Sequence, residues 1–396
     1  MTVLRANIAK WNDDPFVVRV AASPDRPQES RGHEAFLLMG GETDIDGFRA
    51  LLRFGSGDSS AGGVISLPES FKYLQEGDIL RFVPRAGEVA TLYRRRSAFN
   101  ALFMTERCNS NCIMCSQPPR DVQDGHHVEA YLQAIPLMDL MTPSLGITGG
   151  EPTLLGDGLI EVVRSCAVHL PFTSLHLLSN GRLFNYMSLS QSLAAAEHPD
   201  LMVGIPLYSD LAARHDFVVQ AKGAFDQTIR GVMNLKRCNV PVEIRVVLHA
   251  QTVGRLPELA RFISRNLPNV DHVVLMGLEN MGYVKMNLQA LWIDPVEYQS
   301  ALREAVETLA GSGMNVSIYN HPLCVLDREL WPFAKQSISD WKNEYLPQCG
   351  QCSVKSKCSG FFASYKLRYS DHIRPMASDD VRGTDSLTRK VGAECG

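Results

Sequence analysis

The sequence predicts an α/β fold, in which a partial barrel of six strand–helix units lies between a small β-rich N-terminal domain and a C-terminal cysteine module. Short apolar runs separated by Gly, Asp, Ser and Pro clusters fill the first 98 residues. Similar runs then alternate with segments of helical period, and four cysteines gather between positions 324 and 358. We therefore expect domains at 1–98, 99–313 and 314–376, followed by a flexible tail at 377–396.

The N-terminal domain shows an all-β pattern. A tight hairpin is expected where Pro84, Arg85, Ala86 and Gly87 join the last two apolar runs, and the domain as a whole could form a partly closed barrel. The expected strands lie at 16–20, 35–38, 50–54, 79–83 and 89–93.

The central region has the rhythm of a parallel sheet. The expected strands lie at 101–105, 145–148, 174–179, 201–207, 242–249 and 272–277, and helices between them include 158–169, 225–237 and 257–266. A last helix is marked by Asp294 as N-cap, Pro295 at the first helical position and Glu297 three residues after the cap. Parallel α/β proteins place their chemistry at the carboxyl ends of the strands, so residues just after each strand are candidate site residues.

Composition narrows the possible classes of protein. The 396 residues are 45% hydrophobic and 21% charged, with a formal net charge of −4, which is ordinary for a globular chain and gives no overall reason to expect nucleic-acid binding. No apolar stretch has membrane-spanning length, and the first twenty residues do not resemble a signal peptide. We therefore expect a cytoplasmic protein without a membrane partner, whose clustered cysteines are metal ligands or reactive thiols.

The first cysteine cluster is the triplet Cys108, Cys112 and Cys115, which follows the first central strand. A closed zinc site needs four ligands, whereas a 4Fe-4S cube held by three cysteines leaves one iron open. The alternatives are a zinc site with a distant fourth ligand, or core cysteines without a metal.

The second cluster consists of Cys349, Cys352 and Cys358, with Cys324 upstream. Four thiolates can close a metal site. An auxiliary 4Fe-4S cluster, a structural zinc and reduced cysteines without metal remain the three interpretations, since the spacing suits either metal.

The triplet spacing, together with Gly149, Gly150, Glu151 and Pro152 after the second central strand, resembles the radical S-adenosylmethionine (radical SAM) enzymes over residues 99–320. The resemblance implies that S-adenosylmethionine (SAM) binds the open iron and is reductively cleaved, giving a 5'-deoxyadenosyl radical that abstracts hydrogen from a substrate. Because the cofactor carries this chemistry, no single catalytic side chain is expected.

The same resemblance implies further cofactor contacts. The two glycines would let backbone approach the ligand, and the Glu151 carboxylate would accept hydrogen bonds from its ammonium group. Ser179 and Asn180 would lie near the ribose, although a Ser-Asn-Gly sequence also suits an ordinary turn. Arg245 would face the methionine carboxylate or form a core ion pair, and Glu279 lies in a loop over 277–282 that would contact adenine or substrate.

The C-terminal module is similar to the SPASM and twitch modules of peptide-modifying radical SAM enzymes, but it is truncated. Phe362 stands where the last cysteine of the pattern would fall, which leaves Cys324 to complete one cluster. The segments 105–119, 92–94 and 358–365 resemble the C-type (HxsC) maturases of the His-Xaa-Ser system.

This narrower resemblance implies a ribosomally made peptide or protein substrate, possibly one with His-Xaa-Ser repeats, on which a modification or cross-link is installed. It also implies a partner radical SAM protein and an electron donor such as flavodoxin or ferredoxin. The alternatives are a radical SAM enzyme acting on a small molecule or nucleotide and, third, a non-catalytic zinc or iron–sulfur binding protein.

Overall fold

The computed structural model describes residues 5–7, 10, 12–38, 45–55, 64–336 and 344–377. The chain divides into two compact units, one of Met1–Glu106, Val122–His176 and Ala195–Leu201, the other of Arg107–Asp121, Leu177–Ala194 and Met202–Gly396. This division differs from the three domains expected from the sequence, whose boundaries stay predictions. The expected tail lies, except for Ala377, outside the described residues.

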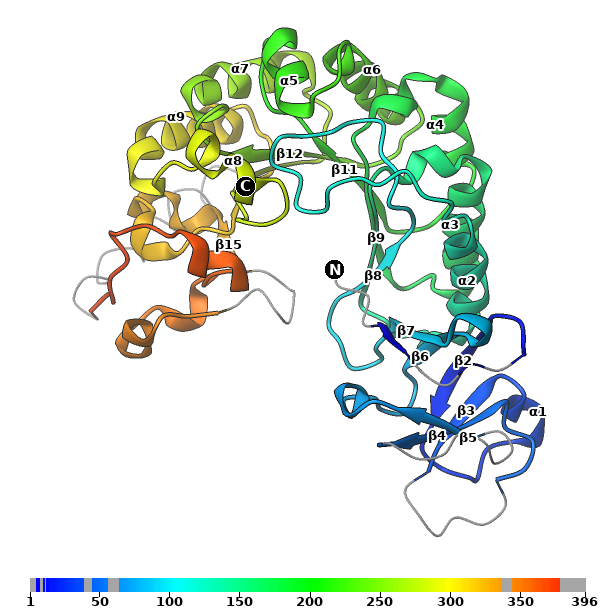
Figure 1. Cartoon of the computed structure of the whole chain (residues 1–396). Coiled ribbons are helices and arrows are strands. Elements are labelled where there is room, and N and C mark those ends of the chain that lie inside the picture. The colour runs from blue at the N-terminus through cyan, green and yellow to red at the C-terminus, as the bar shows by residue number, and fades with distance from the viewer. Residues whose placement is uncertain are drawn as a thin grey trace, which may run out of the picture. The chain divides into compact units, whose positions relative to one another are not determined.

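The first unit begins with a seven-stranded sheet (Figure 1). Its strands follow the order β1-β7-β6-β2-β3-β4-β5, and the short helix α1 (Gln28–Arg31) lies between β2 and β3 in sequence. The expected strands and the hairpin are confirmed, since β6 and β7 pair antiparallel and Gly87 takes a φ of 67° in the turn between them. The strands are β1 (Arg5–Asn7), β2 (Phe16–Ala21), β3 (Glu34–Leu37), β4 (Ala50–Phe54), β5 (Val64–Leu67), β6 (Ile79–Val83) and β7 (Glu88–Tyr93).

The expectation of a partly closed N-terminal barrel is wrong for the described strands. Their order is linear and leaves β1 and β5 at the two edges, and the pairs β2–β3, β3–β4 and β4–β5 run parallel. A strand pattern in the sequence carries no information on direction. Parallel neighbours cannot be joined by a two-residue hairpin, so the pairing direction depends on longer connections.

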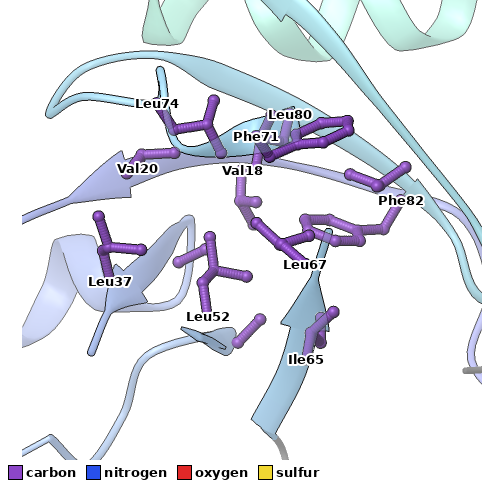
Figure 2. Packing of buried hydrophobic residues seen from close by; sticks show 13 residues of the cluster. Val18, Val20, Leu37, Leu52, Ile65, Leu67, Phe71, Leu74, Leu80 and Phe82 are labelled. Carbon is purple, nitrogen blue, oxygen red and sulfur yellow. The ribbon is translucent and has the colours of Figure 1, made fainter. Parts of the chain in front are cut away.

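Apolar side chains from several strands form the core of this sheet (Figure 2). Val18 of β2, Leu52 of β4 and Leu67 of β5 are fully buried, and Phe82 of β6 packs in the same cluster. Phe71, at the end of the 3-10 helix η1 (Glu69–Phe71), covers them. Burial of each such side chain contributes roughly 1.5–3 kcal/mol, which offsets part of the entropy lost when the sheet becomes ordered.

The second sheet has the sequential order β15-β14-β13-β12-β11-β10-β9-β8. The pairs β8–β9 and β11 through β15 run parallel, and β10 and β11 extend through both units. The six expected strands are confirmed as β8 (Asn100–Phe103), β9 (Ser144–Thr148), β10 (Ser174–Leu178), β11 (Leu201–Pro206), β12 (Val242–Leu248) and β13 (His272–Gly277).

Sequential order distinguishes this α/β fold from a doubly wound sheet. Right-handed crossovers between neighbouring parallel strands return on one face, as in a barrel. The fold class expected from the sequence, an α/β fold built on a parallel half-barrel sheet, is therefore confirmed. The sheet continues beyond six strands, because β14 (Val316–Tyr319) pairs with β13, and the two-residue β15 (Ala334–Lys335) pairs with β14.

Helices connect the strands. The first unit holds α2 (His126–Ala134) and α3 (Asp157–His169), and Figure 1 shows α6, α7 and α9 of the second unit along one side of β11 and β12. The expected helices are confirmed as α3, α6 and α7. The helices of the second unit are α4 (Met187–Ala194), α5 (Ala212–Val219), α6 (Ala224–Arg237), α7 (Leu256–Asn266), α8 (Val284–Leu291) and α9 (Gln299–Gly311).

The capping signal at Asp294 is confirmed. The Asp294 carboxylate accepts a hydrogen bond from the Val296 backbone, and Glu297 accepts one from the Asp294 backbone. The first turn is a 3-10 helix, η7 (Pro295–Tyr298), which leads into α9. Among the described helices, none combines the length and the apolar character needed to cross a bilayer.

Candidate functional site

The three cysteines of the first cluster lie on an irregular loop of the second unit, which the chain enters directly after β8. Backbone hydrogen bonds fix this loop to the end of α5: Asn111 donates to Val219 and Ile113 donates to Val218, each at 3.0 Å. On its other flank the Asn287 amide of α8 donates to the Ile113 carbonyl at 2.8 Å. The loop is therefore held by two helices that are remote from it in sequence.

The thiols of the triplet interact with one another. Burial, together with the neighbouring Cys115 and Cys108 sulfurs, raises the pKa of Cys112 to about 12. Burial also raises the pKa of Cys115, whose thiol donates to the Gln117 carbonyl at 3.0 Å. A metal that binds here must therefore displace protons, and its charge must compensate three thiolates in a partly buried site.

Arg182 and Asn180 contact the loop from the segment after β10. The Arg182 guanidinium donates to the Asn109 carbonyl and, at 3.1 Å, to the Ser110 hydroxyl. The Asn180 amide donates to the Asn109 side chain at 2.6 Å and lies 3.9 Å from the Cys108 sulfur. The sequence singled out Asn180 for a different role and did not single out Arg182, although Arg182 directly follows the Ser-Asn-Gly turn.

Ser179 has a local role in this structure. Its hydroxyl accepts a hydrogen bond from the Gly181 backbone at 3.0 Å, and Gly181 takes a φ of 78°. This is the ordinary turn that the sequence left open as an alternative to a ribose contact. The turn places Asn180 and Arg182 beside the cysteine loop.

Arg245 extends from β12 and keeps 21% of its side chain exposed. One of its nitrogens lies 3.5 Å from Glu243, and another lies 3.6 Å from the Met276 sulfur. The structure thus shows the ion pair that the sequence left open. Burial raises the pKa of Tyr208 well above its usual range. The Cys112 sulfur also raises this pKa, whereas the Arg245 charge lowers it.

Glu279 lies in the loop that follows β13 and is partly exposed. The same loop packs on the cysteine loop, because the Tyr283 backbone donates to the Cys115 carbonyl at 2.9 Å. A Cβ atom on Gly282 would overlap the carbonyl oxygens of Cys115 and Ser116. Only glycine therefore allows the two loops to approach this closely.

The Gly-Gly-Glu-Pro segment belongs to the first unit, where it follows β9. Gly150 donates to the Thr105 carbonyl at 2.7 Å, and Gly149 takes a φ of 152°. The Glu151 carboxylate is fully buried and accepts hydrogen bonds from the backbone and hydroxyl of Thr153. Glu151 thereby caps the 3-10 helix η4 (Pro152–Leu155), a structural role that the sequence did not predict.

The second cysteine cluster surrounds a cavity in the C-terminal part of the second unit. Cys324 lies in the 3-10 helix η8 (Leu323–Val325), and the other three belong to the segment around η10 (Pro347–Gln351) and η11 (Lys355–Lys357). The structure thus brings Cys324 to the three cysteines with which the sequence grouped it. All four line the cavity: Cys324, Cys349, Cys352 and Cys358.

Backbone N–H groups point at these sulfurs. Leu323 and Gly360 donate to Cys358 at 3.4 and 3.5 Å, and Met376 donates to Cys352 at 3.4 Å. Burial, together with the other three cysteine sulfurs, raises the pKa of Cys324 to about 11. Hydrogen bonds to sulfur stabilise thiolates and tune iron–sulfur clusters, so this donor set fits a negatively charged metal centre.

The described residues that line this cavity include two cations, Lys355 and Arg374, and no carboxylate. Positive charge compensates a cluster held by four thiolates. Within the described part of the chain, no three histidine, cysteine, aspartate or glutamate side chains are grouped so as to hold one single metal ion. A 4Fe-4S cube does not require such a group, because each cysteine binds a different iron.

A parallel half-barrel sheet with a three-cysteine loop after its first strand defines a class of α/β proteins. Their three cysteines can hold an iron–sulfur cluster in which one iron has no cysteine ligand. Residues 102–263 match the family model of the Radical SAM superfamily. A protein of this superfamily would carry a 4Fe-4S cluster and SAM as cofactors.

Curated relatives share the same central region. The chain is 28% identical over 161 residues to pre-heme d1 synthase of Dinoroseobacter shibae, which covers 40% of this chain and 38% of that protein. It is 24% identical over 162 residues to GTP 3',8-cyclase of Peptoclostridium acidaminophilum, which covers 39% of this chain and 48% of the relative. The chain thus spans less than half the length of these two relatives.

Among solved structures, Streptococcus suis SuiB bound to S-adenosylmethionine is similar with a TM-score of 0.46 and 16% identity, over 57% of this chain and 51% of that chain. SuiB bound to the precursor peptide SuiA gives a TM-score of 0.44 and 15% identity, over 57% and 49%.

Proposed function

We propose that this protein is a radical SAM enzyme whose SAM-binding 4Fe-4S cluster is held by Cys108, Cys112 and Cys115. The observation that carries the proposal is the loop itself, whose three thiols interact and whose backbone is fixed by α5, α8 and Arg182. The bound cofactors supply a reductively generated 5'-deoxyadenosyl radical that abstracts hydrogen from a substrate.

The chain's own residues hold this site and exclude water from it. Met114 lies between the last two cysteines and packs in a buried apolar cluster with Val218, Val284 and Leu291. Such a cluster fixes the loop and keeps solvent from its inner side. From the resemblance, the proposed SAM contacts are Gly149, Gly150, Glu151, Pro152, Ser179, Asn180, Arg245 and Glu279.

Anaerobic reduction in the presence of SAM tests the proposal. Wild type should release 5'-deoxyadenosine, and Cys112→Ala should release essentially none. Cys238→Ser is a matched control, because this cysteine lies at the end of α6, apart from both clusters. Equal release by Cys112→Ala and wild type would refute the assignment.

We further propose that Cys324, Cys349, Cys352 and Cys358 hold an auxiliary 4Fe-4S cluster, with zinc as the alternative. The cavity that all four line, the N–H···S hydrogen bonds and the two lining cations support a cluster of several thiolates. Such a centre in this position could relay an electron.

For the substrate we propose a ribosomally made peptide or protein, as in the His-Xaa-Ser maturation systems. The enzyme would act together with a partner radical SAM protein and would receive electrons from a flavodoxin or ferredoxin. Support comes from the motif resemblance of the cysteine loop and of the segment around Phe361 and Phe362. A small molecule or nucleotide is the second candidate, which the names of the curated relatives favour. A mass change in a peptide with His-Xaa-Ser repeats after turnover, absent with Cys112→Ala, would decide for the first.

A further inference from the structure

A second cavity lies in the second unit, where the carboxyl ends of three strands meet the segment 359–373. Leu248 ends β12, Gly277 ends β13, and Asn320 directly follows β14. The cavity measures about 90 Å³. Since one water needs about 10–15 Å³ on this scale, there is room for several waters or for one side chain.

Aromatic rings form much of its wall. The rings of Phe361 and Tyr365 are tilted by 40° with their centres 5.2 Å apart. The ring centre of Tyr369 lies 6.1 Å from that of Phe361 and 5.9 Å from that of Tyr365. Trp292 lines the cavity as well, and the Arg368 guanidinium lies 4.3 Å from the centre of its ring. Rings at these separations favour a further ring that packs edge-on or offset against them.

Asn280 supplies a hydrogen-bond acceptor to this wall. Its amide nitrogen donates to the Arg368 carbonyl at 2.7 Å, which fixes the orientation of the side chain. Its Oδ1 atom is buried and has no hydrogen-bond partner among the described residues, and the residue is only 6% exposed. A buried acceptor without a donor costs free energy, so a ligand that brings an N–H or O–H group would be favoured here.

The charge of the wall restricts the ligand further. Arg368 is a cation, and no carboxylate is among the described residues that line the cavity. The Asp294 carboxylate lies behind the wall, where it accepts a hydrogen bond from the lining Ser370 hydroxyl at 2.8 Å. An ammonium or guanidinium group would therefore enter against the charge of Arg368 without a carboxylate in the wall to pair with.

We propose that this cavity binds a neutral aromatic side chain with its own hydrogen-bond donor, an indole or a phenol, whose N–H or O–H is accepted by Asn280. The rings of Phe361, Tyr365 and Tyr369 would pack on its faces and edges. That this side chain belongs to the peptide substrate rests on the proposed function, whereas the binding does not.

Binding of amino-acid derivatives to the anaerobically purified protein tests the proposal, with saturation-transfer NMR as the measurement. N-acetyl-tryptophanamide and N-acetyl-tyrosinamide should bind, N-acetyl-phenylalaninamide should bind roughly tenfold more weakly because it lacks the donor, and N-acetyl-lysinamide should not bind. Equal binding of the tryptophan and phenylalanine derivatives would overturn the role of Asn280.

Two variants locate the ligand. Asn280→Leu should abolish the preference for the tryptophan over the phenylalanine derivative. Tyr369→Ala should weaken both, and this ring is 40% exposed, so its removal should leave the fold intact. Phe217→Ala is the matched control, since this ring on α5 is 55% exposed and does not line the cavity. If Tyr369→Ala binds like Phe217→Ala, the proposed site is wrong.

Competition separates this cavity from a cofactor site. Excess S-adenosylhomocysteine should leave the binding of N-acetyl-tryptophanamide unchanged. Displacement would show that the cavity belongs to the cofactor and would overturn the proposal. The readout involves no turnover, so a failure here is distinct from a failure of the 5'-deoxyadenosine assay that tests the proposed function.

Discussion

Arg182 lies outside the cysteine motif, yet its guanidinium contacts the backbone carbonyl of Asn109 and the hydroxyl of Ser110 within that motif. A hydrogen bond from a charged group contributes roughly 1.5–3 kcal/mol. Arg182→Gln should therefore loosen the cysteine loop. We expect iron to leave this variant for a chelator roughly tenfold faster than it leaves wild type under anaerobic conditions.

Two further variants separate the roles of charge and geometry. Arg182→Lys keeps the charge but loses the planar fork, so its rate of iron loss should lie between those of wild type and Arg182→Gln. Arg214→Gln removes an exposed arginine of α5 and should leave the rate unchanged. Iron loss from Arg182→Gln at the wild-type rate would contradict this role.

His249 provides a second prediction at this scale. The residue follows β12 and is fully buried. Its Nδ1 atom accepts a hydrogen bond from the Gln251 backbone at 3.2 Å, and its Nε2 atom has no hydrogen-bond partner in the described part of the chain. Burial lowers the pKa of His249 to about 4. Between pH 6.5 and 4 the unfolded chain binds a proton that the folded chain does not, so stability falls as the pH falls through this window.

At pH 5 this histidine alone should cost about 2 kcal/mol of the free energy of unfolding relative to pH 7. His249→Asn keeps an acceptor but cannot titrate, so its urea midpoint should fall less than that of wild type between pH 7 and pH 5. The exposed His372 is the matched control, and His372→Asn should follow wild type. Identical pH dependence of His249→Asn and wild type would contradict the interpretation.

At this scale the sequence predicted what local spacing encodes. The cysteines were found because their positions repeat a ligand pattern. Arg182 and Asn287 were not, since each acts on the loop across a long separation in sequence and carries no pattern of its own. Glu151 was assigned to a ligand, but a local contact with Thr153 also uses its carboxylate.

At the scale of elements, the alternation of strands and helices and the cap at Asp294 were predictable, because hydrophobic period and capping chemistry are local. The parallel pairing of β2 through β5 was not, since pairing direction depends on crossovers between distant segments. The bounds of the short helices α4, α5 and α8 were also not predicted. Each has eight residues, too few for a clear period, and depends on packing for its stability.

The segment just before α8, Gly282 and Tyr283, packs on the cysteine loop, and this contact leads to a prediction at the scale of elements. Gly282 has a φ of 53°, and an added methyl group would overlap the Cys115 and Ser116 carbonyls. Gly282→Ala should therefore force the two loops apart, lower the urea midpoint and speed iron loss. Both effects arise from one contact, so they should appear together.

Gly223→Ala separates overlap from backbone strain. Gly223 also has a positive φ, 76°, but a methyl group there would meet no atom within 4 Å. Its substitution should cost only the left-handed strain of about 1–2 kcal/mol, with iron loss unchanged. If the two alanine variants behave alike, close packing of Gly282 on the cysteine loop is not important.

At the scale of the whole molecule, the sequence indicated two separate metal sites and the structure supports their separation in the fold. Cys324 could be grouped with its three partners only by elimination, because its separation of 25 positions from Cys349 is no ligand pattern. The cavity that all four line shows why the grouping holds. The division into two compact units could not be predicted, because each unit is assembled from segments that are not contiguous in sequence.

Metal content should therefore divide into two independent halves. Wild type should hold roughly eight irons per chain, and Cys324→Ser and Cys112→Ala should each hold roughly four, since each removes a ligand of one cluster only. The double variant should hold almost none, because the sites share no ligand, and Cys238→Ser should match wild type. Four irons and one zinc in wild type, with the zinc lost in Cys324→Ser, would instead assign the second site to zinc. Loss of all iron in Cys324→Ser would show that the first cluster depends on the second, which the separate anchoring of the first loop by α5, α8 and Arg182 argues against.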